Sequence, residues 1–146
     1  MSASGTVEAA DKLHSASIHL LRHVRKEDET SGVTASRLSA LSVVVYAGPL
    51  TLGELAAAEQ VRPPTMTKIV YWLEDAGLAR RSWDEKDRRS ARLAATARGR
   101  RVLDDARRRR IENLAARLGK LRSSEVALLA QAAELIEQAL RDDRSE

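Results

Sequence analysis

Apolar residues recur every three or four positions along most of the chain, which is the spacing of one face of an α-helix. The first such stretch predicts a helix over about residues 7–26, closed by a charged turn that ends at Gly32. A second helix is predicted to open after Thr34 and to stop at Gly48. The apolar positions of the first helix are Leu13, Ile18, Leu21 and Val24. The N-terminal part of the chain is therefore expected to form two amphipathic helices.

Two short helices follow, and each carries its own start signal. Thr51 and Glu54 have the spacing of a capping box, in which a hydroxyl and a carboxylate satisfy unpaired backbone N–H groups. Pro63 and Pro64 start the next helix, and Gly77 stops it. Its predicted inward face is Met66, Ile69, Val70 and Leu73. A short helix, a tight turn and a second helix with a free polar face form a helix-turn-helix, whose second helix can lie in the major groove of DNA.

After Gly77 the pattern changes to that of two short strands, at 78–83 and 91–94, joined by a charged turn. A slim charged hairpin directly after a helix-turn-helix is a wing. An arginine at its tip can enter the narrow minor groove of DNA, where the negative potential is enhanced. Beyond the hairpin, a long helix is predicted from the N-cap Thr96 and a last helix from near Ser123.

These elements predict a mostly α fold, within the α+β class: a winged helix-turn-helix lobe with long N- and C-terminal helices. We expect a single domain over residues 1–146, with the winged lobe at 34–95 and dimerisation helices at 1–33 and 96–146. The terminal helices carry apolar stripes that one small lobe cannot cover. A homodimer is therefore expected.

Composition agrees with a helical nucleic-acid-binding protein. The 146 residues include 24 Ala and 19 Leu, which are strong helix formers. The net charge is +4, but residues 78–110 hold 13 Lys and Arg against 5 Asp and Glu, whereas the other residues hold 12 against 16. Such a concentrated basic region suits nucleic acid or an anionic membrane surface, and composition alone does not choose between the two. No cysteine is present and no apolar run approaches the ~20 residues of a membrane span, so we expect a cytoplasmic protein without thiol chemistry or a membrane partner.

Five segments, by their order and spacing, together resemble the MarR family of winged-helix transcriptional regulators. They are Leu50–Ala56, Val61–Lys68, Leu73–Arg80, Asp87–Ser90 and Thr96–Gly99. The resemblance implies a homodimer whose first, fifth and sixth helices interlock, bound to a palindromic operator in double-stranded DNA. It places Lys68 at the basic position of the recognition helix and makes Arg89 the minor-groove residue. It also implies a ligand cleft between the dimer helices and the DNA-binding lobe.

The predicted DNA-binding residues lie on the second helix of the motif and on the hairpin. They are Arg62, Pro63, Pro64, Thr65, Thr67, Lys68, Arg80, Asp87, Arg88 and Arg89. Tyr46, Tyr71 and Trp72 are the aromatic residues expected near the implied ligand cleft, with core packing as the simpler role for each. Because no cysteine can sense oxidants, release of a repressor by a small aromatic ligand is the economical hypothesis for control.

Two alternative functions, a metal-responsive regulator and a non-specific DNA-binding protein, are weighed together with the possibility of an enzyme. His19 and His23 could hold a metal ion with Glu27, which would make a metal-responsive regulator, but such a pair is usually helix surface, so neither metal nor cofactor is predicted. A non-specific, basic, nucleoid-type DNA-binding protein is the other alternative. Residues 107–110 are four consecutive arginines that point around all sides of a helix, so most should be solvated. No phosphate loop, Cys nucleophile or Ser–His arrangement is present, so no enzyme is predicted.

Overall fold

The computed structural model describes residues 3–83 and 90–142, and its elements follow the predicted order. The elements are α1 (Ala3–Asp28), the 3-10 helix η1 (Glu29–Ser31), α2 (Ala35–Ala47), β1 (Leu50–Thr51), α3 (Leu52–Ala58), α4 (Pro63–Asp75), β2 (Ala79–Trp83), β3 (Ala91–Ala95), α5 (Ala97–Leu118) and α6 (Ser123–Asp142). The mostly helical winged helix-turn-helix fold is confirmed. In the part of the chain that the structure describes, no helix is long and apolar enough to cross a bilayer.

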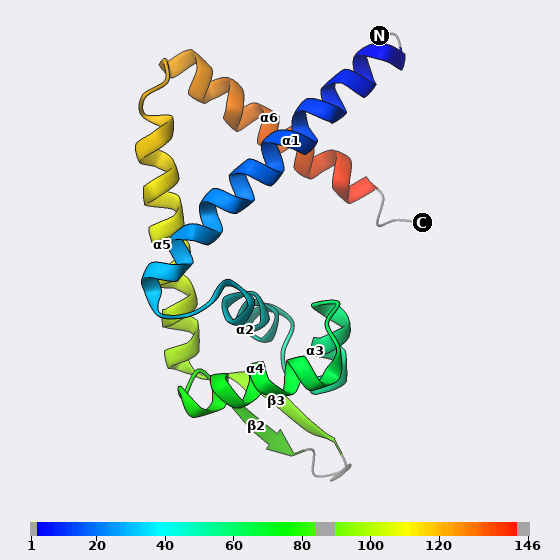
Figure 1. Cartoon of the computed structure of the whole chain (residues 1–146), viewed down its shortest axis with the longest axis vertical. Helices are drawn as coiled ribbons and strands as arrows, with labels where there is room; N and C mark the ends of the chain where they lie inside the picture. The colour runs from blue at the N-terminus through cyan, green and yellow to red at the C-terminus, as the bar shows by residue number, and fades with distance from the viewer. Residues whose placement is uncertain (1–2, 84–89, 143–146) are drawn as a thin grey trace. The chain divides into compact units, whose positions relative to one another are not determined.

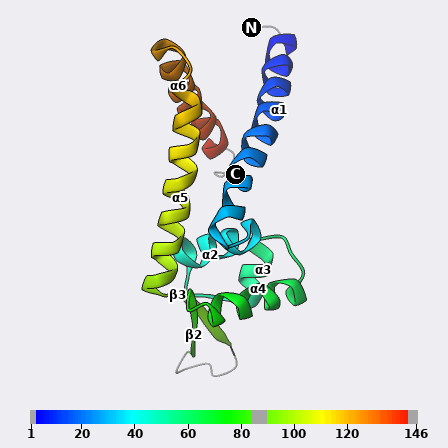
Figure 2. The same ribbon diagram turned by 60° about the vertical axis from the view of Figure 1, so that its left-hand side comes forward.

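The chain forms two compact units, residues 1–110 and 111–146, and the division between them falls within α5. In the first unit, α2, α3 and α4 gather beside the β2–β3 hairpin, which extends beyond these helices in both views (Figures 1 and 2). The second unit holds the end of α5 and all of α6. At the start of α6 the Glu125 carboxylate accepts from the backbone N–H and the guanidinium of Arg122, at 2.9 and 2.7 Å, and this contact lowers the pKa of Glu125.

The core of the first unit lies between these helices and a three-stranded antiparallel sheet in the order β1-β3-β2. Side chains from every one of these layers are buried in it, among them Leu41, Val44, Leu50, Leu55, Met66, Val70, Leu73, Leu78, Leu93 and Leu103. On α4, Met66, Val70 and Leu73 are fully buried, as the helical spacing predicts, whereas Ile69 is half-buried at the edge of that face. The buried face fixes which side of α4 is presented outward.

Strand β1 was not among the predicted elements. It consists of only Leu50 and Thr51, paired with Leu93 and Arg92 of β3. Two residues are too few for an alternating pattern to be visible in the sequence. The pairing places Leu50 over the central strand, so it completes the sheet immediately before α3 begins.

The predicted start and stop signals are confirmed in their hydrogen bonds. Thr51 Oγ1 accepts from the Glu54 N–H at 3.2 Å, and the Thr51 N–H donates to Glu54 Oε2 at 2.8 Å, which completes the capping box of α3. Gly77 takes a left-handed φ of 71° after α4, and the Leu78 N–H donates to the Leu73 carbonyl at 2.8 Å, as in a Schellman cap. Thr96 Oγ1 accepts from the N–H of the third residue after it at 3.0 Å, which caps α5.

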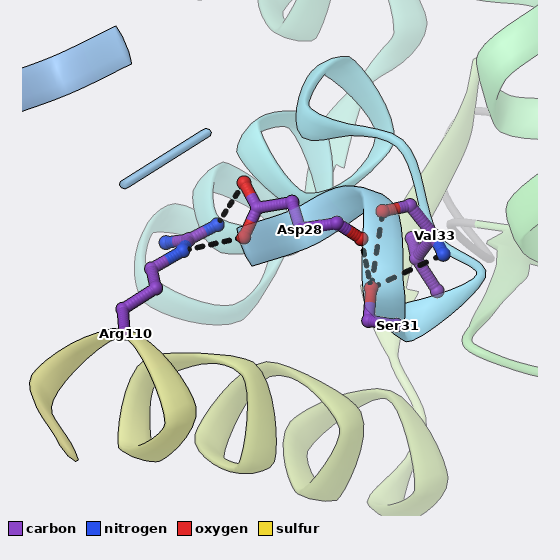
Figure 3. Close-up of polar contacts among 4 residues, drawn as sticks. All are labelled: Asp28, Ser31, Val33 and Arg110. Carbon is purple, nitrogen blue, oxygen red and sulfur yellow. Dashed lines mark hydrogen bonds and ion pairs between the residues drawn. The ribbon is translucent and has the colours of Figure 1, made fainter. Parts of the chain in front are cut away.

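An ion pair between the buried Asp28 and the half-buried Arg110 joins α1 to α5 within the first unit (Figure 3). The Asp28 side chain is 3% exposed, and its two carboxylate oxygens accept from Arg110 Nε and Nη2 at 2.7 and 2.9 Å. The Ser31 hydroxyl donates to the Asp28 carbonyl at 2.6 Å and accepts from the Val33 N–H at 3.2 Å. The end of α1 and the turn into α2 are therefore fastened to α5 by side chains 82 positions apart.

Candidate nucleic-acid interface

The N-terminal half of α4 presents its polar side chains outward. Arg62, Pro63, Pro64, Thr65 and Lys68 are exposed, and Thr67 is half-buried. The helix-turn-helix thus brings together the six residues that sequence reasoning placed on this helix. Between α3 and α4 the turn is tight enough that Gln60 takes a left-handed φ of 54°, a conformation that a residue with a side chain rarely adopts.

Thr67 has a restricted chemistry on this surface. Its hydroxyl donates to the Pro63 carbonyl at 2.9 Å, one turn earlier in the helix. The hydroxyl proton is therefore used within α4, and Thr67 can offer a partner only acceptor lone pairs and its methyl group. A threonine methyl group is suited to contact with the methyl group of thymine.

Charge changes sign along α4. Arg62 and Lys68 carry positive charge on its N-terminal half, whereas Glu74 and Asp75 close its C-terminal end. A polyanion is attracted to the first half and repelled by the second, so the helix has a preferred end for approaching phosphates.

The two faces of the β2 strand carry different arginines, because side chains alternate along a strand. Ala79 is buried against the core, and Arg81 lies on that same face and reaches α4. Arg80 lies on the opposite face and is exposed. The other predicted hairpin residues, Asp87, Arg88 and Arg89, lie outside the described residues.

Arg81 is a candidate functional residue that sequence reasoning missed. Its Nε atom lies 2.9 Å from Glu74 Oε1, and its guanidinium carbon lies 5.8 Å from the centre of the Tyr71 ring. The sequence did contain a signal for it: side chains alternate along a strand, so Arg81 lies on the same face as the apolar Ala79, which is the face toward α4.

The three aromatic residues proposed for ligand contact do not converge. Tyr46 and Tyr71 are 72% and 65% exposed, so core packing, the simpler role predicted for both, is wrong within this chain. Trp72 is half-buried, and the Arg37 guanidinium lies 4.1 Å from the centre of its ring. Of the three, only Trp72 lines a cavity of about 370 Å³, whose wall also includes Arg98 and Arg109.

Residues 3–83 and 90–142 contain no group of three His, Cys, Asp or Glu side chains placed to hold a metal ion. Within these residues, Glu27 is therefore not grouped with His19 and His23 as a three-ligand site.

A helix-turn-helix whose second helix exposes a polar, basic end, followed by an antiparallel hairpin, defines a winged-helix DNA-binding protein. The MarR family pattern matches residues 33–91. Over 127 residues the chain is 38% identical to an HTH-type transcriptional regulator of Mycobacterium tuberculosis, covering 87% of this chain and 89% of the relative. This chain belongs to the MarR family, and it is a DNA-binding transcriptional regulator.

Solved structures show the same fold. YusO from Bacillus subtilis is 25% identical, with a TM-score of 0.73 over 95% of this chain and 99% of that one. A mutant of MepR from Staphylococcus aureus, bound to an oligodeoxyribonucleotide, is 19% identical, with a TM-score of 0.67 over 90% and 97% of the two chains. Regulators of the MarR family bind DNA and act as dimers.

Proposed function

We propose that this protein represses transcription as a homodimer that places its two α4 helices in successive major grooves of an inverted repeat. The observation that carries the proposal is the orientation of α4: Met66, Val70 and Leu73 are fully buried, so its polar N-terminal half faces outward. A dimer bound over a promoter blocks RNA polymerase, and this makes repression the simplest consequence of binding.

The homodimer is supported by apolar side chains that each terminal helix leaves exposed. On α1 these are Leu13, Ile18, Leu20 and Leu21, and on α6 they are Leu128, Leu129, Leu135, Ile136 and Leu140. Exposed apolar stripes of this length mark an association surface. A second copy of the same chain offers matching stripes on helices of the same length.

Roles on DNA follow from the chemistry of the proposed contact residues. Lys68 can donate to guanine O6 and N7, and the Thr65 and Thr67 methyl groups suit thymine. The exposed Arg62 and Arg80 are proposed to neutralise phosphates, with Pro63 and Pro64 against the DNA backbone. The hairpin residues are assigned from sequence alone: Arg88 and Arg89 are proposed for the minor groove, with Asp87 orienting a guanidinium.

The experiment that tests the proposal starts from DNA selected from a random pool by the purified protein. We expect an inverted repeat with half-sites about 10 bp apart, because two symmetric helices must enter the same face of the duplex. Lys68→Ala should weaken binding by about tenfold and relax the preference at one position of each half-site. Fluorescence anisotropy measures both effects. Lys120→Ala removes the same charge from an exposed lysine outside α4 and should change affinity by less than about twofold.

Light scattering should report two chains for each DNA fragment. A single bound chain, or Lys120→Ala weakening binding as much as Lys68→Ala, would overturn the proposed binding mode.

We further propose that a small aromatic anion binds in the cavity beside Trp72 and thereby releases the dimer from its DNA. Trp72 lines this cavity with the Arg37 guanidinium 4.1 Å from its ring centre, and Arg98 and Arg109 in the wall supply positive charge for a carboxylate against the single Asp105. Aromatic carboxylates should therefore dissociate the complex, and Arg109→Gln should abolish release while leaving DNA affinity unchanged. Ligand binding can be followed by Trp72 fluorescence in a Trp83→Phe background. Linkage requires each releasing ligand to bind free dimer more tightly than DNA-bound dimer, and equal affinities would refute this mechanism.

A further inference from the structure

Arg81 connects the two parts of the molecule that are proposed to reach DNA. It belongs to β2 of the hairpin, and both of its contacts, Glu74 and Tyr71, belong to α4. The Arg81 Nε atom donates to Glu74 Oε1 at 2.9 Å, and the guanidinium carbon lies 5.8 Å from the Tyr71 ring centre. Because Tyr71 and Glu74 are three residues apart, they lie on one face of α4, and Arg81 spans almost one helical turn.

The surroundings of this contact strengthen it. The side chains of Arg81 and Glu74 are 35% and 28% exposed, so both have lost much of their water. On the aromatic side, a guanidinium within about 6 Å of a ring centre is attracted to the ring. The neighbouring Arg80 offers a direct comparison, since it carries the same charge on the opposite face of β2.

We propose that Arg81 is a positioning residue for DNA recognition, one that holds the hairpin at a defined position against α4 through Glu74 and Tyr71. The proposal rests on the placement of α4 in the major groove. In this role the Arg81 guanidinium is paired with the Glu74 carboxylate through its Nε atom and is not used to neutralise a phosphate. The acidic Glu74, which by charge alone opposes DNA binding, contributes to affinity by holding Arg81.

This role matters because helix and hairpin engage different features of the duplex. If the hairpin were free to move on α4, its ordering would occur on binding and would reduce affinity. A contact that sets the position in the free protein removes that cost. It also keeps the spacing between the two DNA-binding elements constant from one operator to the next.

The test uses charge-matched pairs of variants on the selected operator, with the Kd measured over a range of salt concentrations at 25 °C. Arg81→Gln and Glu74→Ala should each weaken binding by about two- to fivefold, and the double variant should be no weaker than either single variant.

Arg81→Gln should leave the dependence of log Kd on log salt unchanged, because no phosphate contact is lost. Arg80→Gln, which removes a proposed phosphate contact, should reduce that slope by about 0.9. Asp75→Ala is the control for Glu74→Ala: it measures how much DNA affinity rises when an acidic charge is removed from the end of α4.

Several outcomes would overturn the proposal. One is Glu74→Ala tightening binding as Asp75→Ala does, and another is Arg81→Gln reducing the salt slope as Arg80→Gln does. A third is a lower thermal midpoint with unchanged DNA affinity, because a contact that serves stability alone would give that result. If Lys68→Ala is also without effect, the placement of α4 itself is wrong. If Lys68→Ala weakens binding while the Arg81 and Glu74 variants do not, only the positioning role fails.

Discussion

Replacing Arg110 with alanine is expected to destabilise the protein by about 3 kcal/mol, because the Asp28 carboxylate would remain buried without its partner. Asp28 is 3% exposed and both of its carboxylate oxygens are bonded to Arg110. The measurement is denaturant unfolding at one fixed protein concentration, since dimerisation makes apparent stability depend on concentration.

A matched control lies two residues earlier on the same helix. Arg108 pairs with Asp105 at 2.9 Å, but the two side chains are 66% and 54% exposed, so Arg108→Ala should cost less than about 1 kcal/mol. The double replacement Asp28→Leu with Arg110→Met removes both charges together and should recover most of the stability lost in Arg110→Ala. Equal losses in Arg108→Ala and Arg110→Ala would show that burial does not set the strength of this pair.

Replacing Gly99 with alanine is expected to cost about 3 kcal/mol, since the added methyl group has no space. A Cβ atom at Gly99 would lie 2.0 Å from the Leu78 carbonyl oxygen, which is backbone and cannot rotate away. Relief requires α5 to move from the segment that follows α4, where Thr96 also donates to the Gly77 carbonyl at 2.6 Å. Denaturant unfolding measures the loss in the same way.

Gly53→Ala is the control for this substitution. Gly53 lies in α3, and an added Cβ would come no closer than 4.0 Å to the Thr51 hydroxyl. Alanine is the better helix former, so this variant should gain about 0.5–1 kcal/mol. If Gly99→Ala left the free energy of unfolding unchanged while Gly53→Ala raised it, α5 would not be held as close to the Leu78 carbonyl as the structure shows.

The fold was largely predictable because its boundaries depend on short local signals. The capping box at Thr51 and Glu54, the proline pair that opens α4 and the glycine at position 77 each act on hydrogen bonds within a few residues. The periodicity of α4 then placed Met66, Val70 and Leu73 inside. Signals of this kind are visible without knowing what the rest of the chain does.

What was missed involves partners distant in sequence or faces that only tertiary packing selects. Nothing near Arg110 in the sequence indicates that it, among four consecutive arginines, pairs with Asp28. Arg107, Arg108 and Arg109 are exposed, as predicted for most of that run. The exposure of Tyr46, near the end of the apolar helix α2, was not predicted either.

The proline pair at the start of α4 has a consequence for the proposed contact of this helix with DNA. A helix normally offers free backbone N–H groups at its first turn, and these bind phosphate regardless of sequence. Pro63 and Pro64 have no N–H to offer, and the N–H groups of Thr65 and Met66 are both directed to the Arg62 carbonyl, at 3.0 and 3.1 Å. Pro63 and Pro64 thus remove two of the main-chain donors that a helix start usually offers to an anion, and the N–H of Thr65 is bonded within the chain. With α4 in the major groove as proposed, affinity at this end has to come mainly from side chains, so substitutions there are expected to change the operator preference without a large, fixed backbone contribution.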